Sequence, residues 1–108
     1  MTDGYFFDGI NDAVIRKEKN KARELRKTSW WKNRIARGIC HYCGVKADPK
    51  ALTMDHIVPL SRGGRSTKGN LVPCCKDCNN KKKTLLPVEW EEYMYRMEKK
   101  KAEEQEEC

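Results

Sequence analysis

Two Cys-x-x-Cys pairs constrain the fold of this chain more than any other feature: Cys40–Cys43 and Cys75–Cys78, with residues 44–74 between them. Two residues between cysteines let both thiolates face one ion from a tight turn, and two such turns complete a tetrahedral S₄ shell that suits Zn²⁺. A closed shell leaves no position for substrate, so we expect a structural ion that supports folding by ~10 kcal/mol or more. The competing interpretation, a redox-active pair, lacks a thioredoxin-like βαβ context and does not explain why there are two pairs.

The size of the chain explains why it needs such an ion. At 108 residues, with 38% hydrophobic and 36% charged residues, it is too short for two domains and too poor in apolar residues for a large enzyme core. No apolar run is long enough to cross a membrane. The N-terminus has no basic region before an apolar stretch, so we expect no secretory signal and a reducing, cytoplasmic compartment.

The remaining cysteines and one histidine near the pairs are not expected to be ligands. His41 lies inside the first pair, but four thiolates already fill a tetrahedron, so we expect it to be exposed. Cys74 is expected to be a small buried residue, and Cys108 a free terminal thiol.

The net charge of +7 is unevenly distributed. Residues 1–10 carry −2, residues 11–37 carry +7, residues 38–87 carry +6 and residues 88–108 carry −4. Basic surfaces attract polyanions through counterion release, so the pattern favours a nucleic-acid partner, although a solvated helix face explains residues 11–37 equally well. The candidate DNA contacts are Arg16, Lys17, Arg23, Arg26, Lys27, Arg62 and Lys82.

Helical patterns precede the first cysteine pair. We expect a polar helix over residues 11–28, capped by Asp8 or Asn11. A second short helix is expected to be capped by Ser29 and to end before Gly38, which suits a left-handed C′ position. One long helix with a bend at the junction is the alternative.

The segment that contains the cysteines has short strand patterns. We expect a strand within Ala51–Leu60, a loop over residues 61–69, a short strand that starts at Leu71 and ends at Pro73, and a short helix over residues 76–84. A last helix begins near Pro87 and frays after Lys100. The predicted fold is a single α+β domain in three parts: a basic helical extension at 1–38, a zinc-stapled core at 39–86, and a C-terminal helix with an acidic tail at 87–108.

An ordered set of motifs lies within the core. It runs Asp55-His56-Ile57-Val58-Pro59-Leu60, then Gly63-Gly64, Asn70-Leu71 and Cys75-x-x-Cys78-Asn79-x-x-Lys82. Together with the first cysteine pair, this set resembles the HNH endonucleases of the ββα-metal superfamily, in the subgroup with four zinc cysteines. The resemblance covers about residues 40–90, while residues 1–38 and the acidic tail show none.

The resemblance implies a role for each matching residue. Asp55 takes the place of the first ligand of a catalytic metal ion, His56 that of the general base, and Asn79 that of the second metal ligand. Asn70 takes the place of the asparagine that tethers the loop and helps to aim the base. Many members have histidine at the first or last position. Two oxygen ligands here favour Mg²⁺ or Mn²⁺, with Ni²⁺ or Zn²⁺ as alternatives.

The chemistry expected of such a site is hydrolysis of DNA phosphodiester bonds. A neutral histidine, whose reference pKa is ~6.5, can take a proton from water near neutral pH. The resemblance implies products with 3′-hydroxyl and 5′-phosphate ends. The alternatives are a non-catalytic zinc module that binds DNA or RNA, and a protein-interaction knuckle that leaves the basic segments unexplained. A partner protein could supply specificity, and the oligomeric state is not indicated.

Overall fold

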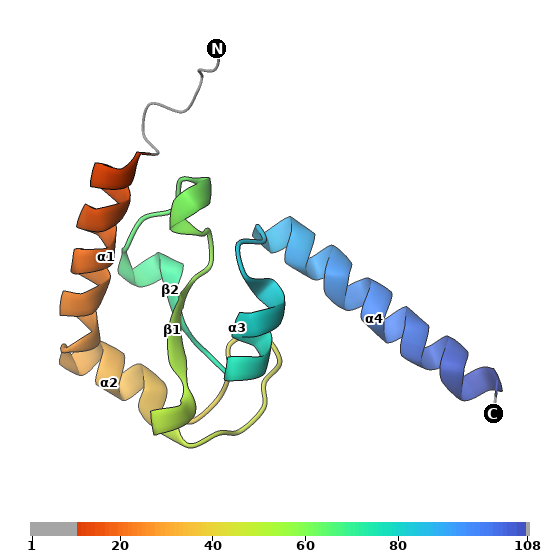
Figure 1. The fold of residues 1–108 in the computed structure, drawn as a ribbon. Coiled ribbons are helices and arrows are strands. Elements are labelled where there is room, and N and C mark those ends of the chain that lie inside the picture. Colours follow the sequence, from red (N-terminus) through yellow and green to blue (C-terminus); the bar gives the residue numbers. More distant parts are fainter. Residues whose placement is uncertain (1–10, 108) are drawn as a thin grey trace, which may run out of the picture.

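The computed structural model of the chain describes residues 11–107, arranged as two N-terminal helices, a two-stranded sheet and two further helices (Figure 1). No helix in this part of the chain is both long and apolar enough to span a membrane. The elements are α1 (Asp12–Arg26), α2 (Ser29–Ala36), β1 (Thr53–His56), β2 (Leu71–Cys74), α3 (Lys76–Lys82) and α4 (Pro87–Glu107).

The N-terminal segment forms two helices rather than one long one. The break is capped by Thr28, and not by Ser29 as expected: its extended backbone lets the side chain accept a hydrogen bond from the backbone N–H of Trp31 at 3.4 Å. The same hydroxyl donates to the carbonyl of Leu25 at 2.6 Å, so one side chain serves both helix ends. Gly38 follows α2 with φ of +67°, the left-handed conformation expected of it.

Helix α1 begins at the cap predicted from the sequence. The side chain of Asn11 accepts from the backbone N–H of Val14 at 3.0 Å, while the other candidate cap, Asp8, lies outside the described residues. Only a narrow stripe of α1 is buried, at Glu18 and Ala22, and this stripe faces the loop between the two strands. The rest of the helix is largely exposed, as its charge predicts.

The sheet is an antiparallel pair that is shorter than the sequence suggested. Thr53 pairs with Cys74, Asp55 with Val72 and His56 with Leu71. The predicted start of the first strand forms a 3₁₀ turn instead, over residues 49–51. Pro73 lies inside β2 instead of ending it. Proline has no backbone N–H to donate to a neighbouring strand, and an edge strand such as β2 tolerates this loss.

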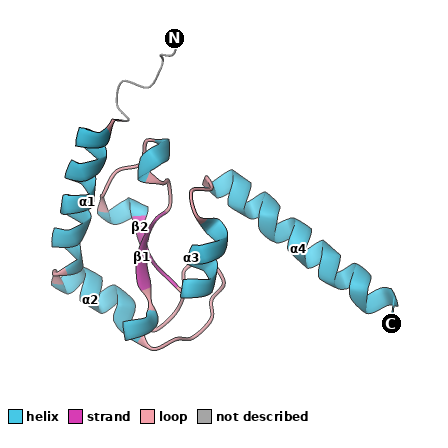
Figure 2. Cartoon of the chain, viewed as in Figure 1, coloured by secondary structure: helices cyan, strands magenta, loops and turns pink. Residues whose placement is uncertain are grey.

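Helix α3 packs on β1, while α1 and α2 lie on the opposite side of the strands (Figures 1 and 2). Strands β1 and β2 with α3 form the expected ββα unit, which confirms the α+β class. The buried core cluster contains Cys40, Cys74, Cys78 and Trp90, so the start of α4 packs on the cysteines. Beyond that start, α4 projects away from the body of the molecule (Figure 1) and stays helical to Glu107 rather than fraying after residue 100.

Candidate active site

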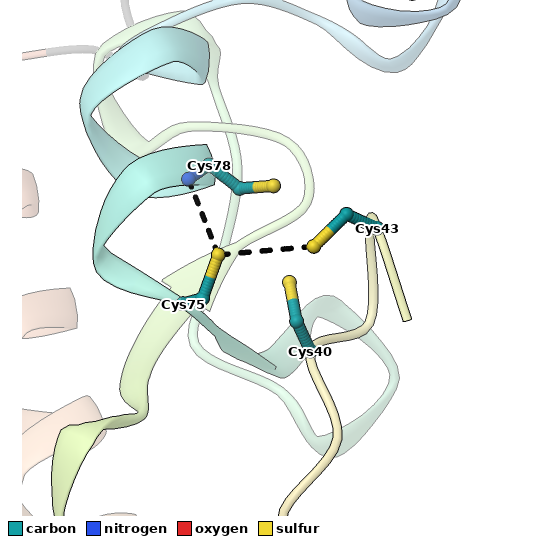
Figure 3. A group of neighbouring side chains, drawn as sticks. All are labelled: Cys40, Cys43, Cys75 and Cys78. Carbon is teal, nitrogen blue, oxygen red and sulfur yellow. Dashed lines mark hydrogen bonds between the residues drawn. The ribbon is translucent and has the colours of Figure 1, made fainter. Parts of the chain in front are cut away.

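The four predicted ligand cysteines meet at one point. The sulfur atoms of Cys40, Cys43, Cys75 and Cys78 all lie within 4.8 Å of one another, and none is in a disulfide (Figure 3). The sulfurs of Cys43 and Cys75 are 3.8 Å apart. Tetrahedral bonds of ~2.3 Å to one zinc ion require sulfurs ~3.8 Å apart, so the donor set fits Zn²⁺.

Local backbone structure builds each half of this cluster. The first knuckle is a tight turn in which the N–H of Gly44, at φ of +73°, donates to the carbonyl of Cys40 at 3.0 Å. In the second, Cys75 caps α3, and its sulfur accepts from the backbone N–H of Cys78 at 3.4 Å. The backbone N–H of His41 donates to the carbonyl of Pro73 at 2.9 Å, which attaches the first knuckle to β2.

Cys74 differs from the four predicted ligands in position, because it is not part of their group. Burial alone would raise the pKa of Cys40, but backbone N–H groups of the two knuckles lower it to about 7. Burial, and then the neighbouring thiols, raise the pKa of Cys78, so a cation beside its sulfur is needed to hold this group as a thiolate at neutral pH. Cys74 is fully buried outside the group of four predicted ligands, and burial raises its pKa to about 12. Both observations agree with the structural role predicted for it. His41 is exposed and outside the cluster, also as predicted. The terminal thiol of Cys108 lies outside the described residues.

Asp55 is held between the zinc knuckle and α3. Tyr42, which stands between the first two cysteines, donates its hydroxyl hydrogen bond to Asp55 Oδ2 at 2.6 Å. The ammonium of Lys82 lies 3.1 Å from the same oxygen and also donates to the carbonyl of His56 at 3.1 Å. Within residues 11–107, both contacts use Oδ2, so Oδ1 is the carboxylate oxygen available to a metal ion.

The position of Lys82 corrects one prediction. The sequence groups it with the residues that could contact DNA, but the structure buries it completely, at 0% exposure. Its flanking residues Lys81 and Lys83 are exposed, because the helix turns only the middle lysine toward β1. We therefore assign Lys82 to neutralising the charge of Asp55 and not to holding phosphate.

His56 ends β1, and its ring is half-buried. Nε2 of the ring lies 2.9 Å from the hydroxyl of Ser66, in the loop between the strands. Burial lowers the pKa of His56 despite the adjacent charge of Asp55, so the neutral ring dominates at neutral pH. The sequence alone did not point to Ser66, because a single serine in a polar loop carries no pattern.

Asn70 closes that same loop. Its side-chain oxygen accepts from the backbone N–H of Val58 at 2.9 Å, and its amide donates to the carbonyls of Val58 at 3.1 Å and Arg65 at 2.8 Å. The backbone carbonyl of Asn70 also accepts from Ile57 at 2.9 Å. These bonds are the tether expected of this residue, while its effect on catalysis stays a prediction.

A cleft of about 360 Å³ opens beside the end of β1. Asp55 and His56 both line it, with Lys83 and Thr84 from the turn after α3 and with Lys19 from α1. Lys19, a residue that the sequence pattern did not single out, therefore brings positive charge to this cleft. The structure thus brings the predicted ligand and the predicted base to one basic cavity.

Asn79, the predicted second metal ligand, does not line that cleft in this structure. It is half-buried on α3, one helical turn before Lys82, which contacts Asp55. Residues three apart on a helix share a face, so Asn79 lies on the side of α3 that faces β1. Its role as a ligand remains a proposal.

The other candidate DNA contacts are not part of the cleft. Arg62 pairs with Glu89 at 3.2 Å and donates to the carbonyl of Thr84 at 3.3 Å, so it joins the loop to the start of α4 while staying 40% exposed. The remaining candidates are all exposed: Arg16, Lys17, Arg23 and Arg26 lie on α1, and Lys27 is the residue at its C-cap.

Comparison with known proteins supports the assignment of the core. Residues 40–85 match the family model of the HNH endonuclease. The match covers 46 of the 108 residues, and this segment is similar to the HNH endonuclease family. The match contains both zinc knuckles, β1, β2 and α3, while α1, α2 and α4 lie outside it. No curated protein matches the chain.

Proposed function

We propose that this chain is a metal-dependent endonuclease that hydrolyses DNA phosphodiester bonds, with His56 as general base. The observation that carries the proposal is the meeting of Asp55 and His56 at one cleft, beside the exposed ammonium groups of Lys19 and Lys83. A phosphate approaching this cleft finds positive charge, a base and a carboxylate together, as hydrolysis requires.

His56 is suited to take the proton of the attacking water. Because burial lowers its pKa, the ring is neutral at the pH where a general base must accept a proton. The hydrogen bond to Ser66 occupies Nε2, so the remaining nitrogen, Nδ1, is the proton acceptor.

Asp55 Oδ1 and the side-chain oxygen of Asn79 would hold the catalytic metal ion. Two protein oxygens suit Mg²⁺ or Mn²⁺, which keep several positions for water and phosphate. When bound, the ion supplies positive charge to the phosphate and to the departing 3′ oxygen. Cleavage of that bond leaves 3′-hydroxyl and 5′-phosphate ends.

Nicking of supercoiled plasmid tests the proposal. The zinc-loaded protein is incubated with Mg²⁺ or Mn²⁺, and with EDTA as a metal-free control. The variant His56→Ala should lose nicking, whereas His41→Ala, which alters the only other histidine at an exposed site, should keep it. Equal nicking by wild type and His56→Ala would refute the catalytic assignment.

A non-catalytic DNA-binding module is the second candidate, and one observation favours it. Lys82 already neutralises Asp55, so the carboxylate has a partner without any catalytic ion. A module of this kind would retard DNA in a gel in every divalent metal without cutting it. Retardation without cleavage by wild-type protein would therefore select this candidate.

A further inference from the structure

One buried acid in the described chain has no part in the chemistry proposed above. Glu18 lies in the middle of α1, outside the HNH match, and is only 3% exposed on a helix whose neighbours are mostly basic. A buried carboxylate is costly unless it is paired and hydrogen-bonded. Its partners lie chiefly in the loop between the strands: the backbone N–H of Ser66 donates to Oε1 at 2.6 Å, and Arg65 lies 3.5 Å from Oε2.

Ser66 is attached to α1 a second time, through its hydroxyl. The hydroxyl is 2.5 Å from the backbone carbonyl of Glu18 and donates to it. A carbonyl oxygen can only accept, so the single hydroxyl proton of Ser66 is used in this bond. The serine is 2% exposed, which leaves its lone pairs to the protein.

The direction of this bond fixes the ring of His56. Nε2 lies 2.9 Å from the same hydroxyl oxygen, which has only lone pairs left to offer. Nε2 must therefore carry a proton and donate, and the neutral ring must be the Nε2–H tautomer with its lone pair on Nδ1. The chain of contacts runs from α1 through the loop to the base.

We propose that Ser66, held in place by Glu18, is a positioning residue that selects the orientation and tautomer of His56. Helix α1 then contributes to the active site, because its residue Glu18 holds Ser66 in place. The catalytic part of this inference rests on the proposed nuclease function, but the tautomer does not. The two can therefore fail separately.

The tautomer is measured by ¹⁵N NMR of the zinc-loaded full chain at a pH where His56 is neutral. The chain has only two histidines, so His41→Ala assigns the spectrum. Wild type should show one protonated nitrogen, Nε2, and one lone-pair nitrogen, Nδ1. Ser66→Ala should show averaged signals of both tautomers, as a ring without a fixed acceptor does, while the exposed neighbour variant Thr67→Ala should match wild type. Protonation of Nδ1 in wild type, or an unchanged spectrum in Ser66→Ala, would overturn the proposal whether or not the protein cuts DNA.

Nicking kinetics test the functional consequence. Ser66→Ala should lower kcat on the order of 10²-fold, the cost of a misplaced general base, and leave KM close to wild type. Glu18→Ala should lower kcat likewise, and Glu18→Gln should recover a large share, because its amide oxygen can still accept from the backbone N–H of Ser66. Glu24→Ala is the matched control, since Glu24 is an exposed acid of the same helix.

The outcomes separate the two proposals. If wild type binds DNA without cutting it but shows the Nε2–H tautomer that Ser66→Ala loses, the nuclease function fails and the positioning role stands. If wild type cuts DNA and Ser66→Ala cuts with the same kcat, the nuclease function stands and the positioning role fails. Circular dichroism and zinc content of each variant show whether a loss of kcat comes from unfolding. Thr67→Ala, whose tautomer should match wild type, is the folded reference.

Discussion

The buried pair of Lys82 and Asp55 offers the sharpest test of how this site is held together. The change is Lys82→Met, which keeps an unbranched side chain of similar length and removes the ammonium. It also removes the hydrogen bond to the carbonyl of His56. Asp55 is then left with Tyr42 as its remaining side-chain partner among the described residues.

The expected loss of stability follows from the burial of both groups. The side chain of Lys82 is 1% exposed and that of Asp55 is 11% exposed, with nitrogen and oxygen 3.1 Å apart. Removing one partner of a buried ion pair leaves an uncompensated charge and costs ~3–5 kcal/mol. In a domain of this size each kcal/mol lowers Tm by ~4–8 °C, so the variant should melt at least ~12 °C below wild type.

Thermal unfolding of the zinc-saturated proteins measures this loss. Lys81→Met is the matched control, because Lys81 is an exposed neighbour in an i,i+4 pair with Asp77, which solvent screens. The double variant Asp55→Asn with Lys82→Met should regain a large share of the loss, since asparagine can still accept from Tyr42. Added Mn²⁺ should also raise the Tm of Lys82→Met more than that of wild type, if Asp55 is a metal ligand.

Two results would refute this reasoning. One is a Tm for Lys82→Met as close to wild type as that of the Lys81→Met control, which would mean that the ammonium does not compensate Asp55. The other is a double variant no more stable than Lys82→Met alone, which would mean that the loss comes from packing and not from charge.

The same geometry makes three further predictions. The purified protein should contain about one zinc ion per chain by elemental analysis. Cys75→Ser should lose the ion and unfold, as measured by circular dichroism. A folded, metal-free wild type would contradict the zinc assignment. The backbone N–H of Ser66 is the main cause that lowers the pKa of Glu18 below its ordinary 4.5, so this group stabilises the fold above that pH and loses its effect as the pH falls through the lower folded value. The difference in Tm between wild type and Glu18→Gln should therefore shrink from pH 6 to pH 3, and a constant difference would contradict the assignment. Replacing Arg16, Lys17, Arg23 and Lys27 by alanine should reduce the slope of log affinity for DNA against log salt concentration, by ~0.9 for each phosphate that these residues no longer neutralise. As a control, alanines at the exposed residues 99–101 of α4 should leave the slope unchanged. An unaltered slope in the first variant would exclude α1 from the DNA interface.

The zinc shell and the loop tether could be predicted from the sequence because each is encoded by local spacing. A Cys-x-x-Cys turn places two thiolates together whatever surrounds it, and the second turn repeats the arrangement. The resemblance to a family supplied the role of Asn70, and the hydrogen bonds of its side chain agree with it. Both features can therefore be predicted without knowledge of the tertiary structure.

The partners of the base and of the metal ligand could not be predicted in the same way. Lys82 stands in a run of three lysines, and only the phase of a short helix shows that the middle one is buried. Glu18 is 48 residues from Ser66 in the chain, and a lone acid in a basic helix looks like a surface residue. Both contacts arise from packing between elements, for which one sequence carries no local signal.

The strand limits also depended on tertiary contacts. The hydrophobic run that suggested ten residues of strand is interrupted where Asn70 draws the backbone of Val58 into the loop, so pairing stops at His56. At its other end, Asp48 caps a 3₁₀ turn by accepting from the backbone N–H of Lys50 at 2.9 Å. Side-chain hydrogen bonds to the backbone therefore compete with the sheet at both ends.

The predicted zinc ligands Cys40 and Cys78 belong to the buried core cluster that also contains Trp90, so the predicted ion would lie at the centre of the fold. Tyr42 carries this arrangement one step further, because it lies between two of the ligands and holds Asp55. A chain built in this way has little apolar core to retain its shape before the ion arrives. We therefore expect its folding to depend on zinc supply, so that the proposed cleavage site forms only in chains that have acquired the metal.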